Sequence, residues 1–225
     1  MNKFIKDSLK LYYTPRACSL VSYVALKEVD AKFEIQPINL RNKEQMTDEF
    51  LRINPKHRVP ILFINGEALT ENVAILLWID SNFPDANLIS KNKMQRAQTV
   101  SFLAWCSSSI HPALTPNGIP ERYCDLPNSA ENVKKCAQKL LNEYFLIAEG
   151  MLNEKKWFFD YFSAADIYFL WCFRRAIQFE IDLNFLPNCN AHFQRVLTRP
   201  SVQDAIEFES KTIESFNWTK ILGDR

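Results

Sequence analysis

Residues 54–72 read NPKHRVPILFINGEALTEN, and this stretch decides how the first part of the chain folds. An apolar run at 61–64 ends at Asn65-Gly66, a dipeptide typical of a two-residue hairpin turn, and a second strand follows. The polar residues 70–72 then offer capping side chains to an apolar run at 73–79. The stretch therefore predicts a loop, a β-hairpin and a helix.

The residues before the hairpin predict alternating strands and helices. Residues 9–14 are apolar and aromatic, and Pro15 ends this strand because proline has no N–H to donate to a ladder. Apolar residues recur at helical spacing over 19–29, a second strand follows at 33–38, and a second helix follows at 44–51. With the hairpin and the third helix, the predicted order is βαβαββα, which is an α/β class of domain.

The chain beyond Pro84 predicts an all-helical region. The polar stretch 85–93 is the best candidate for a linker. Beyond it, apolar spacing and intervening prolines predict helices at 94–109, 130–153, 164–179, 188–198 and 201–210. We therefore expect an α/β domain at residues 1–83 and an all-helical, all-α domain at residues 94–225.

The composition argues against several classes of protein. Lys and Arg number 27 against 26 Asp and Glu, so no overall field favours nucleic acid or an anionic membrane. No segment has the roughly 18 uninterrupted apolar residues of a membrane span. Lysines also interrupt the apolar residues near the N-terminus before an export signal could form. We expect a cytoplasmic protein with no nucleic-acid partner and no membrane partner.

The cysteines, histidines and glycines argue against other kinds of site. The six cysteines include no Cys-x-x-Cys pair, and a chain with 47% hydrophobic residues needs no disulfides, so reduced thiols are expected. The three histidines have no cysteine or carboxylate at ligand spacing, so no metal site is expected. The four glycines are too dispersed for a phosphate loop or a dinucleotide fingerprint.

Cys18 is the first candidate for chemistry, because it immediately precedes the first predicted helix. Unpaired N–H groups and the helix dipole stabilise a thiolate at such a position, so the sequence predicts a lowered pKa for Cys18. A buried structural cysteine is the alternative. Ser19 fits either a helix N-cap or a donor to a bound thiolate.

Three further positions could hold a ligand. The Val59-Pro60 bond, if cis, would expose backbone groups to an extended peptide, although most X-Pro bonds are trans. Glu71 and Asn72 combine an acceptor, an amide and helix N-terminal N–H groups, which suits either an amino acid's charged ends or simple capping. His111 precedes Pro112 at an expected helix end, where it could be structural or face a cleft.

Together these motifs resemble the glutathione transferase superfamily, and residues 11–20, LYYTPRACSL, are similar to the bacterial beta class in particular. Residues 54–62 resemble the family's cis-proline loop, residues 69–75 its γ-glutamyl-binding turn and helix, and residues 162–166 its capping box and staple. The resemblance spans nearly the whole chain. It implies a thioredoxin-like N-terminal domain that binds glutathione and a helical domain that contributes the pocket for the electrophile.

The candidates for catalysis are Cys18, Ser19 and His111, and the candidates for substrate binding are Val59, Pro60, Glu71, Asn72 and Arg16. The resemblance implies a role for several of them. Cys18 would be the catalytic cysteine, with His111 near it. Val59 would pair its backbone with the cysteinyl part of glutathione, and Glu71 and Asn72 would hold the γ-glutamyl end.

The chain departs from the family's pattern at four positions around the pocket. Arg16 stands where a glycine is usual, so it would either lower the pKa of Cys18 further or block the pocket. Pro112 replaces a common lysine, and Ala104 and Arg175 stand where the beta class tends to have asparagine and tryptophan. The side chains that could line the electrophile pocket are Phe102, Trp105 and Tyr123.

We therefore expect an enzyme that uses Cys18 for thiol transfer or for conjugation of glutathione to small electrophiles, with glutathione as co-substrate. The resemblance also implies a homodimer and a part in detoxification. Two alternatives stay open. One is a noncatalytic interaction or regulatory protein on the same fold. The other is a glutathione-dependent reductase or isomerase for one metabolite, whose carboxylate Arg16 or Arg175 could hold.

Overall fold

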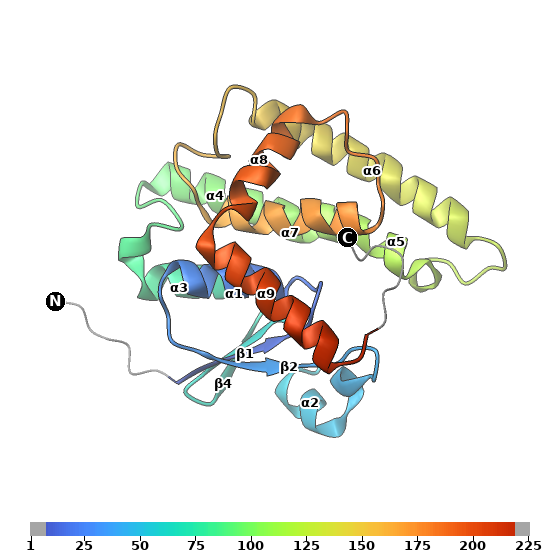
Figure 1. Ribbon diagram of the computed structural model, residues 1–225, viewed down its shortest axis with the longest axis horizontal. Helices are drawn as coiled ribbons and strands as arrows, with labels where there is room; N and C mark the ends of the chain where they lie inside the picture. The colour runs from blue at the N-terminus through green and yellow to red at the C-terminus, as the bar shows by residue number, and fades with distance from the viewer. Residues whose placement is uncertain (1–7, 219–225) are drawn as a thin grey trace. The chain divides into compact units, whose positions relative to one another are not determined.

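The computed structural model describes residues 8–218, which pack into two units (Figure 1). The first unit holds residues 8–91 and 199–218, and the second holds residues 92–198. This division differs from the expected domains, 1–83 and 94–225, mainly at the final helix, which packs within the first unit.

The first unit is built on a mixed four-stranded sheet. Its strands are β1 (Leu9–Tyr13), β2 (Glu34–Pro37), β3 (Ile61–Ile64) and β4 (Glu67–Thr70), in the order β2-β1-β3-β4. β1 pairs in parallel with β2, whereas β3 pairs antiparallel with both β1 and β4. The helices that accompany the sheet are α1 (Ser19–Glu28), α2 (Asp48–Ile53) and α3 (Asn72–Asn82). The predicted βαβαββα order and the fold class are confirmed.

The core of this unit lies between the sheet and its helices. Leu11 of β1 and Leu62 of β3 are register partners and are fully buried. Leu20 of α1 and Ile75 of α3 are fully buried as well, and the two helices pack against each other. Burial on this scale is the main stabilising term for such a domain. It fixes the end of β1 and the start of α1, which is where Cys18 lies.

The helix predicted at 44–51 divides in the structure. A 3-10 turn spans Glu44–Met46, and α2 begins anew after Thr47, whose hydroxyl accepts from the backbone N–H of Phe50 at 3.3 Å. Thr47 has extended backbone angles and acts as an N-cap, so the chain changes direction there.

The last helix, α9 (Pro200–Ser215), packs along α1 and is held there by polar contacts. The Tyr23 hydroxyl donates to Asp204 at 2.7 Å. Arg199, the residue before α9, donates two hydrogen bonds to Glu28 at the end of α1, at 2.8 and 2.6 Å. A bidentate, charge-assisted pair fixes geometry more strongly than a single contact does. These contacts account for the assignment of α9 to the first unit.

The stretch 85–93, expected as a linker, is partly packed. A 3-10 turn covers Pro84–Ala86, and Leu88 and Ile89 are buried in the first unit. The buried carboxylate of Asp80 accepts the Ile89 N–H at 3.0 Å. The polar composition of the stretch predicted a linker. Two apolar residues within it, Leu88 and Ile89, are buried and hold it against the fold.

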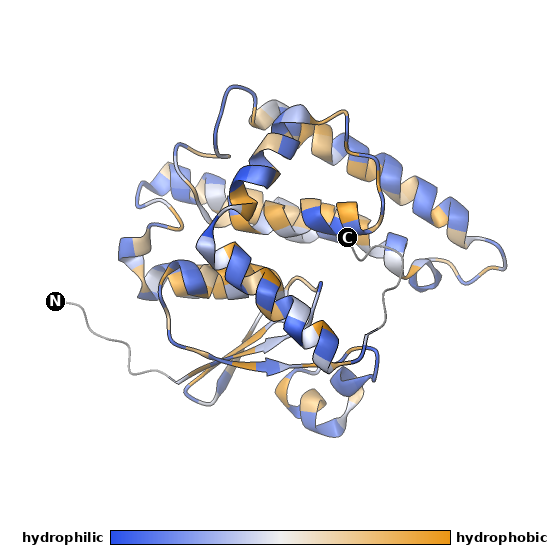
Figure 2. Ribbon diagram, viewed as in Figure 1, coloured by the Kyte–Doolittle hydropathy of each residue, from blue (hydrophilic) through white to orange (hydrophobic). Residues whose placement is uncertain are grey.

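The second unit is all-helical, as predicted. Its helices are α4 (Lys93–Trp105), α5 (His111–Gly118), α6 (Ala130–Met151), α7 (Ala164–Gln178) and α8 (Pro187–Leu197), with a 3-10 turn at Pro120–Arg122. Figure 2 shows hydrophobic residues along most of α7, which is buried over nearly its whole length, whereas α6 carries many hydrophilic residues. Among residues 8–218, no helix is both long and apolar enough to cross a membrane.

The predicted end of a helix before Pro112 is wrong. α4 continues through a π-helical turn, Cys106–Ile110, into α5, so His111 lies inside a continuous helical segment. Proline has no N–H and its ring crowds the preceding turn, and a wider π turn just before Pro112 relieves both conflicts.

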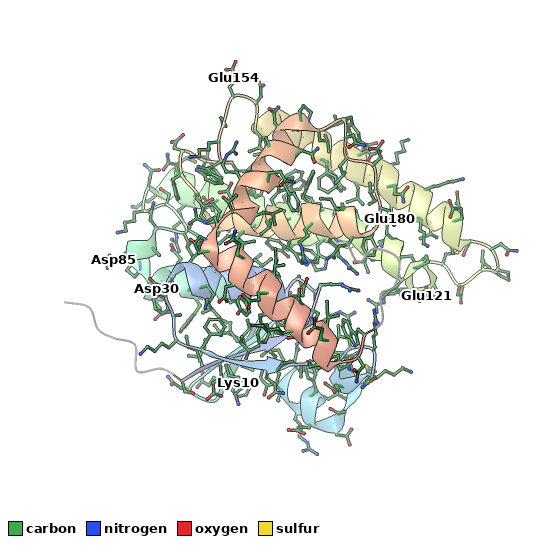
Figure 3. The ribbon with its side chains drawn as sticks, in the orientation of Figure 1. Lys10, Asp30, Asp85, Glu121, Glu154 and Glu180 are labelled. Carbon is green, nitrogen blue, oxygen red and sulfur yellow. The ribbon has the colours of Figure 1, made fainter. Side chains whose placement is uncertain are left out.

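Two helices end with a left-handed residue that is not glycine. Asp30 after α1 and Glu180 after α7 have φ of 52° and 58°. In each case the next residue donates back into the helix, from Ala31 to Leu26 and from Ile181 to Ala176, which is the Schellman pattern. Both charged residues are exposed, and both are labelled in Figure 3.

Candidate active site

Cys18 lies in the turn between β1 and α1, as the sequence predicted. It is the residue that precedes α1, and its carbonyl accepts the Val21 N–H at 3.1 Å. Ser19 is fully buried, and its hydroxyl donates to the Thr14 carbonyl at 3.1 Å and accepts the Thr14 N–H at 3.0 Å. Ser19 is the first residue of α1, so the N-cap role is wrong and Cys18 is the N-cap residue. The role of Ser19 as a donor to a bound thiolate stays a prediction. The Ser19 hydroxyl closes the turn that presents Cys18.

The Cys18 thiol faces the loop that precedes β3. Its Sγ donates to the carbonyl oxygen of Val59 at 3.4 Å, and the Val59–Pro60 peptide bond is cis. Val59 and Pro60 are both buried, and Asn54 supports the loop by donating to the Arg58 carbonyl at 2.8 Å. The structure thus brings together Cys18, Val59 and Pro60, three of the predicted site residues.

The expected lowering of the Cys18 pKa is wrong for this structure. Burial of the thiol raises the pKa of Cys18 to about 12, although part of the residue still reaches solvent. Hydrogen bonds from its own backbone and from the Asn72 side chain lower this pKa in part. The Glu71 carboxylate raises it, and the Arg58 guanidinium lowers it. Desolvation outweighs the helix N-terminus because an enclosed thiolate loses its hydration.

Glu71 and Asn72 lie at the start of α3. Glu71 has a left-handed φ of 73°, and its carboxylate pairs with the Lys56 ammonium at 2.6 Å, with the Glu71 side chain 68% exposed. Lys56 also donates to the Thr70 hydroxyl at 2.7 Å. Asn72 is buried instead, and its amide donates to the Cys18 carbonyl at 3.0 Å. The helix start therefore offers backbone N–H groups and an exposed carboxylate beside a lysine.

Arg16 has a left-handed φ of 64°, and its backbone N–H donates to the Glu209 carboxylate of α9 at 2.6 Å. Glu209 is buried, and it also accepts from the Tyr13 hydroxyl at 3.3 Å. The cation that lowers the pKa of Cys18 is Arg58, in place of the Arg16 that the sequence suggested. A charge-assisted bond to a buried carboxylate holds the turn in a conformation that only glycine adopts without strain.

His111 belongs to the second unit. Its ring lies edge-on to the Trp171 ring, with centroids 4.4 Å apart. Arg175, in the same unit, stacks its guanidinium over Phe179 at 4.1 Å and donates to Gln178 at 3.0 Å. The proposed role of His111 near Cys18 stays a prediction.

A cavity of about 560 Å³ lies within the second unit, between α4, the end of α6 and the loop at 158–160. Phe102 and Trp105, two of the expected pocket residues, line it. Tyr123 is not among its lining residues; it is exposed and donates to the Pro112 carbonyl at 3.3 Å. Within residues 8–218, no group of three His, Cys, Asp or Glu side chains could hold a metal ion.

Several residues of the site were missed by sequence reasoning. Arg58 and Lys56 lie in the loop motif that was recognised, so their position gave a usable signal. Ser22 and Glu209 gave no usable signal, because each contacts a partner that is distant in the sequence. Ser22 donates to Asn72, 50 positions away, and Glu209 accepts from Arg16, 193 positions away.

Comparison with known proteins agrees with this architecture. Residues 7–81 match the model of the glutathione S-transferase N-terminal domain. The glutathione S-transferase GstA of Escherichia coli O157:H7 is 30% identical over 205 residues, which cover 89% of this chain and 98% of the relative. The chain therefore belongs to the glutathione S-transferase family, a family of enzymes, and it is similar to the bacterial beta class.

Two solved structures are close in fold. The beta-class glutathione S-transferase of Sphingomonas chungbukensis has a TM-score of 0.79 and 33% identity, covering 89% of this chain and 98% of that one. A sphingomonad glutathione S-transferase solved in complex with glutathione has a TM-score of 0.80 and 29% identity, with the same coverage of 89% and 98%.

Proposed function

We propose that this protein is a glutathione transferase in which Cys18 is the reacting thiol. The observation that carries the proposal is the 3.4 Å contact between the Cys18 thiol and the Val59 carbonyl. Backbone groups beside a buried strand can pair with an extended peptide, and here they lie within reach of a nucleophile. A structural relative solved with glutathione bound supports the choice of ligand.

In this proposal glutathione lies extended along the loop before β3. Its cysteinyl amide N–H donates to the Val59 carbonyl, and its cysteinyl carbonyl accepts from the Val59 N–H. The γ-glutamyl amine pairs with the exposed Glu71 carboxylate, and the γ-glutamyl carboxylate accepts from the first N–H groups of α3. Lys56 already neutralises Glu71, so amine binding shares or displaces that ion pair.

The proposed thiol transfer proceeds in two exchanges. The Cys18 thiolate attacks the glutathione sulfur of a mixed disulfide, the S–S bond breaks, and the substrate thiolate leaves and takes up a proton. A second glutathione thiolate then attacks the Cys18–glutathione disulfide, which releases oxidised glutathione and restores Cys18. In conjugation, the glutathione thiolate instead attacks an electrophilic carbon and displaces its leaving group.

The first test is calorimetric titration of reduced glutathione into the fully reduced protein and into a Cys18→Ser variant. A Cys136→Ser variant, altered at an exposed cysteine of α6, is the matched control. We expect micromolar to millimolar binding by the wild type and the control. In a separate assay of glutathione-dependent reduction of a mixed disulfide, we expect Cys18→Ser to lose activity and Cys136→Ser to keep it. Absence of glutathione binding by the wild type would contradict the proposal and favour a noncatalytic interaction protein.

The proposal also keeps two expectations, a homodimer and a cytoplasmic location. Exposed apolar side chains on α6 support the first, since Leu140 and Ile147 are 45% and 54% exposed and lie seven residues apart on one face of the helix.

A further inference from the structure

Asn72 is the first residue of α3, yet the residue is only 5% exposed and its side chain contacts α1. Its Nδ2 donates to the Cys18 carbonyl at 3.0 Å, and its Oδ1 accepts from the Ser22 hydroxyl at 2.8 Å. Ser22 lies one helical turn after Cys18 and is fully buried. One amide thus bridges two points at the start of the helix that carries the thiol.

The orientation of this amide is fixed by its neighbours. The Cys18 carbonyl can only accept a hydrogen bond, so the NH₂ group must face it, and the oxygen must face the Ser22 hydroxyl. The Cys18 carbonyl also accepts the Val21 N–H at 3.1 Å. Two donors, the Asn72 amide and the Val21 N–H, therefore fix the position of the Cys18 carbonyl. The Cys18 thiol itself lies against Val59.

We infer that Asn72 is a positioning residue for Cys18: its side-chain amide holds the Cys18 peptide, and with it the thiol, in place against α1. This assigns the Asn72 side chain to the thiol, whereas the sequence assigned it to the γ-glutamyl end of the ligand. Only the backbone N–H of Asn72 is then left to a ligand. The inference rests on the proposed function in taking Cys18 as the reacting thiol.

The electrostatics around Cys18 agree with this role. The Asn72 hydrogen bond lowers the pKa of Cys18 and so opposes burial. The charged groups that act on the same sulfur are Glu71, which raises this pKa, and Arg58, which lowers it. Neutral substitutions at Asn72 or Ser22 leave both charges in place, so their effect on reactivity reports on the amide.

The test is the rate at which iodoacetamide alkylates Cys18 in the fully reduced full-length protein, followed by peptide mass spectrometry over a range of pH. Cys136, exposed on α6, serves as the internal reference in every sample. We expect Asn72→Ala to slow the alkylation of Cys18 by roughly three- to tenfold, because one hydrogen bond to the Cys18 residue is lost, and we expect Cys136 to be unchanged.

Two further variants keep the result decisive. Ser22→Ala removes the hydroxyl that orients the Asn72 amide but keeps the amide itself. We therefore expect an alkylation rate between those of the wild type and Asn72→Ala. If Asn72→Ala does not fold, a wild-type rate in Ser22→Ala would overturn the inference. Asn82→Ala is the matched control on α3, because its amide donates within the helix, to the Trp78 carbonyl at 2.8 Å, and we expect the wild-type rate. Wild-type or faster alkylation of Cys18 in a folded Asn72→Ala protein would overturn the inference. Because iodoacetamide needs no glutathione, failure to bind glutathione would defeat the proposed function alone.

Discussion

The Cys18 thiol and the Val59 carbonyl form a 3.4 Å hydrogen bond in which the nucleophile itself occupies a backbone acceptor. An extended ligand that pairs with Val59 competes for the same oxygen. The contact favours the protonated thiol, because only the S–H form can donate. Burial acts in the same direction and raises the pKa of Cys18 to about 12.

The pH dependence of Cys18 alkylation tests this relationship. Only the thiolate reacts, so with a pKa of about 12 we expect the rate in the ligand-free protein to rise about tenfold per pH unit between about pH 7 and about pH 10. Peptide mass spectrometry after iodoacetamide treatment gives the rate at Cys18 itself. A plateau below about pH 9 would show that the thiol is already ionised there and would contradict the effect of burial.

The sequence was a good guide wherever the signal was local. The hairpin around Asn65-Gly66 follows from turn chemistry, and the strand at 9–13 from its apolar pattern and Pro15. The capping box at Ser163 and Asp166 is confirmed as well. In each case the residues that decide the structure are neighbours in the chain.

The sequence was a poor guide wherever distant parts of the chain meet. The helix dipole predicted a lowered pKa for Cys18, but the burial that reverses it comes from the surrounding fold. Arg16 looked like a cation for the site, but its backbone is held by Glu209, 193 positions away. The continuation of the helix through Pro112 depended on a π turn, which has no reliable sequence signature.

The exposed face of α6 predicts the oligomeric state. We expect a homodimer by light scattering after size exclusion, and we expect Ile147→Glu to shift it toward monomer, because a buried unpaired charge at an interface is costly. Leu126→Glu, at a 68% exposed position before α6, is the control and should leave the dimer intact. A wild-type protein that is monomeric at micromolar concentration would defeat this prediction.

His57 offers a test of backbone strain in the loop before β3. It has a left-handed φ of 56°, and its buried Nδ1 has no hydrogen-bond partner among residues 8–218. His57→Gly relieves the strain and His57→Ala does not, so we expect the glycine variant to exceed the alanine variant by about 1 kcal/mol in free energy of unfolding. Urea denaturation measures the difference. An alanine variant that is as stable as the glycine variant would mean that the backbone is not strained there.

Asp166 holds the second unit together through a buried carboxylate. It accepts from the Ser163 N–H at 2.8 Å and the Phe158 N–H at 3.1 Å, and it lies 2.8 Å from His192 Nε2. Removing the carboxylate leaves several buried polar groups without partners, so we expect Asp166→Ala to lower the free energy of unfolding by about 3–5 kcal/mol.

Asp166→Asn separates the effect of shape from that of charge. The asparagine keeps one acceptor oxygen, so we expect Asp166→Asn to lower the free energy of unfolding by less than Asp166→Ala does. Asp182→Ala is the control, because that carboxylate caps the exposed Asn184 N–H at 3.0 Å in a loop, and we expect a change within about 0.5 kcal/mol. Urea unfolding followed by circular dichroism compares the three variants. Equal losses for Asp166→Ala and Asp182→Ala would show that the buried network adds no more than a surface cap, and the link from α7 to α8 would then rest on apolar packing alone.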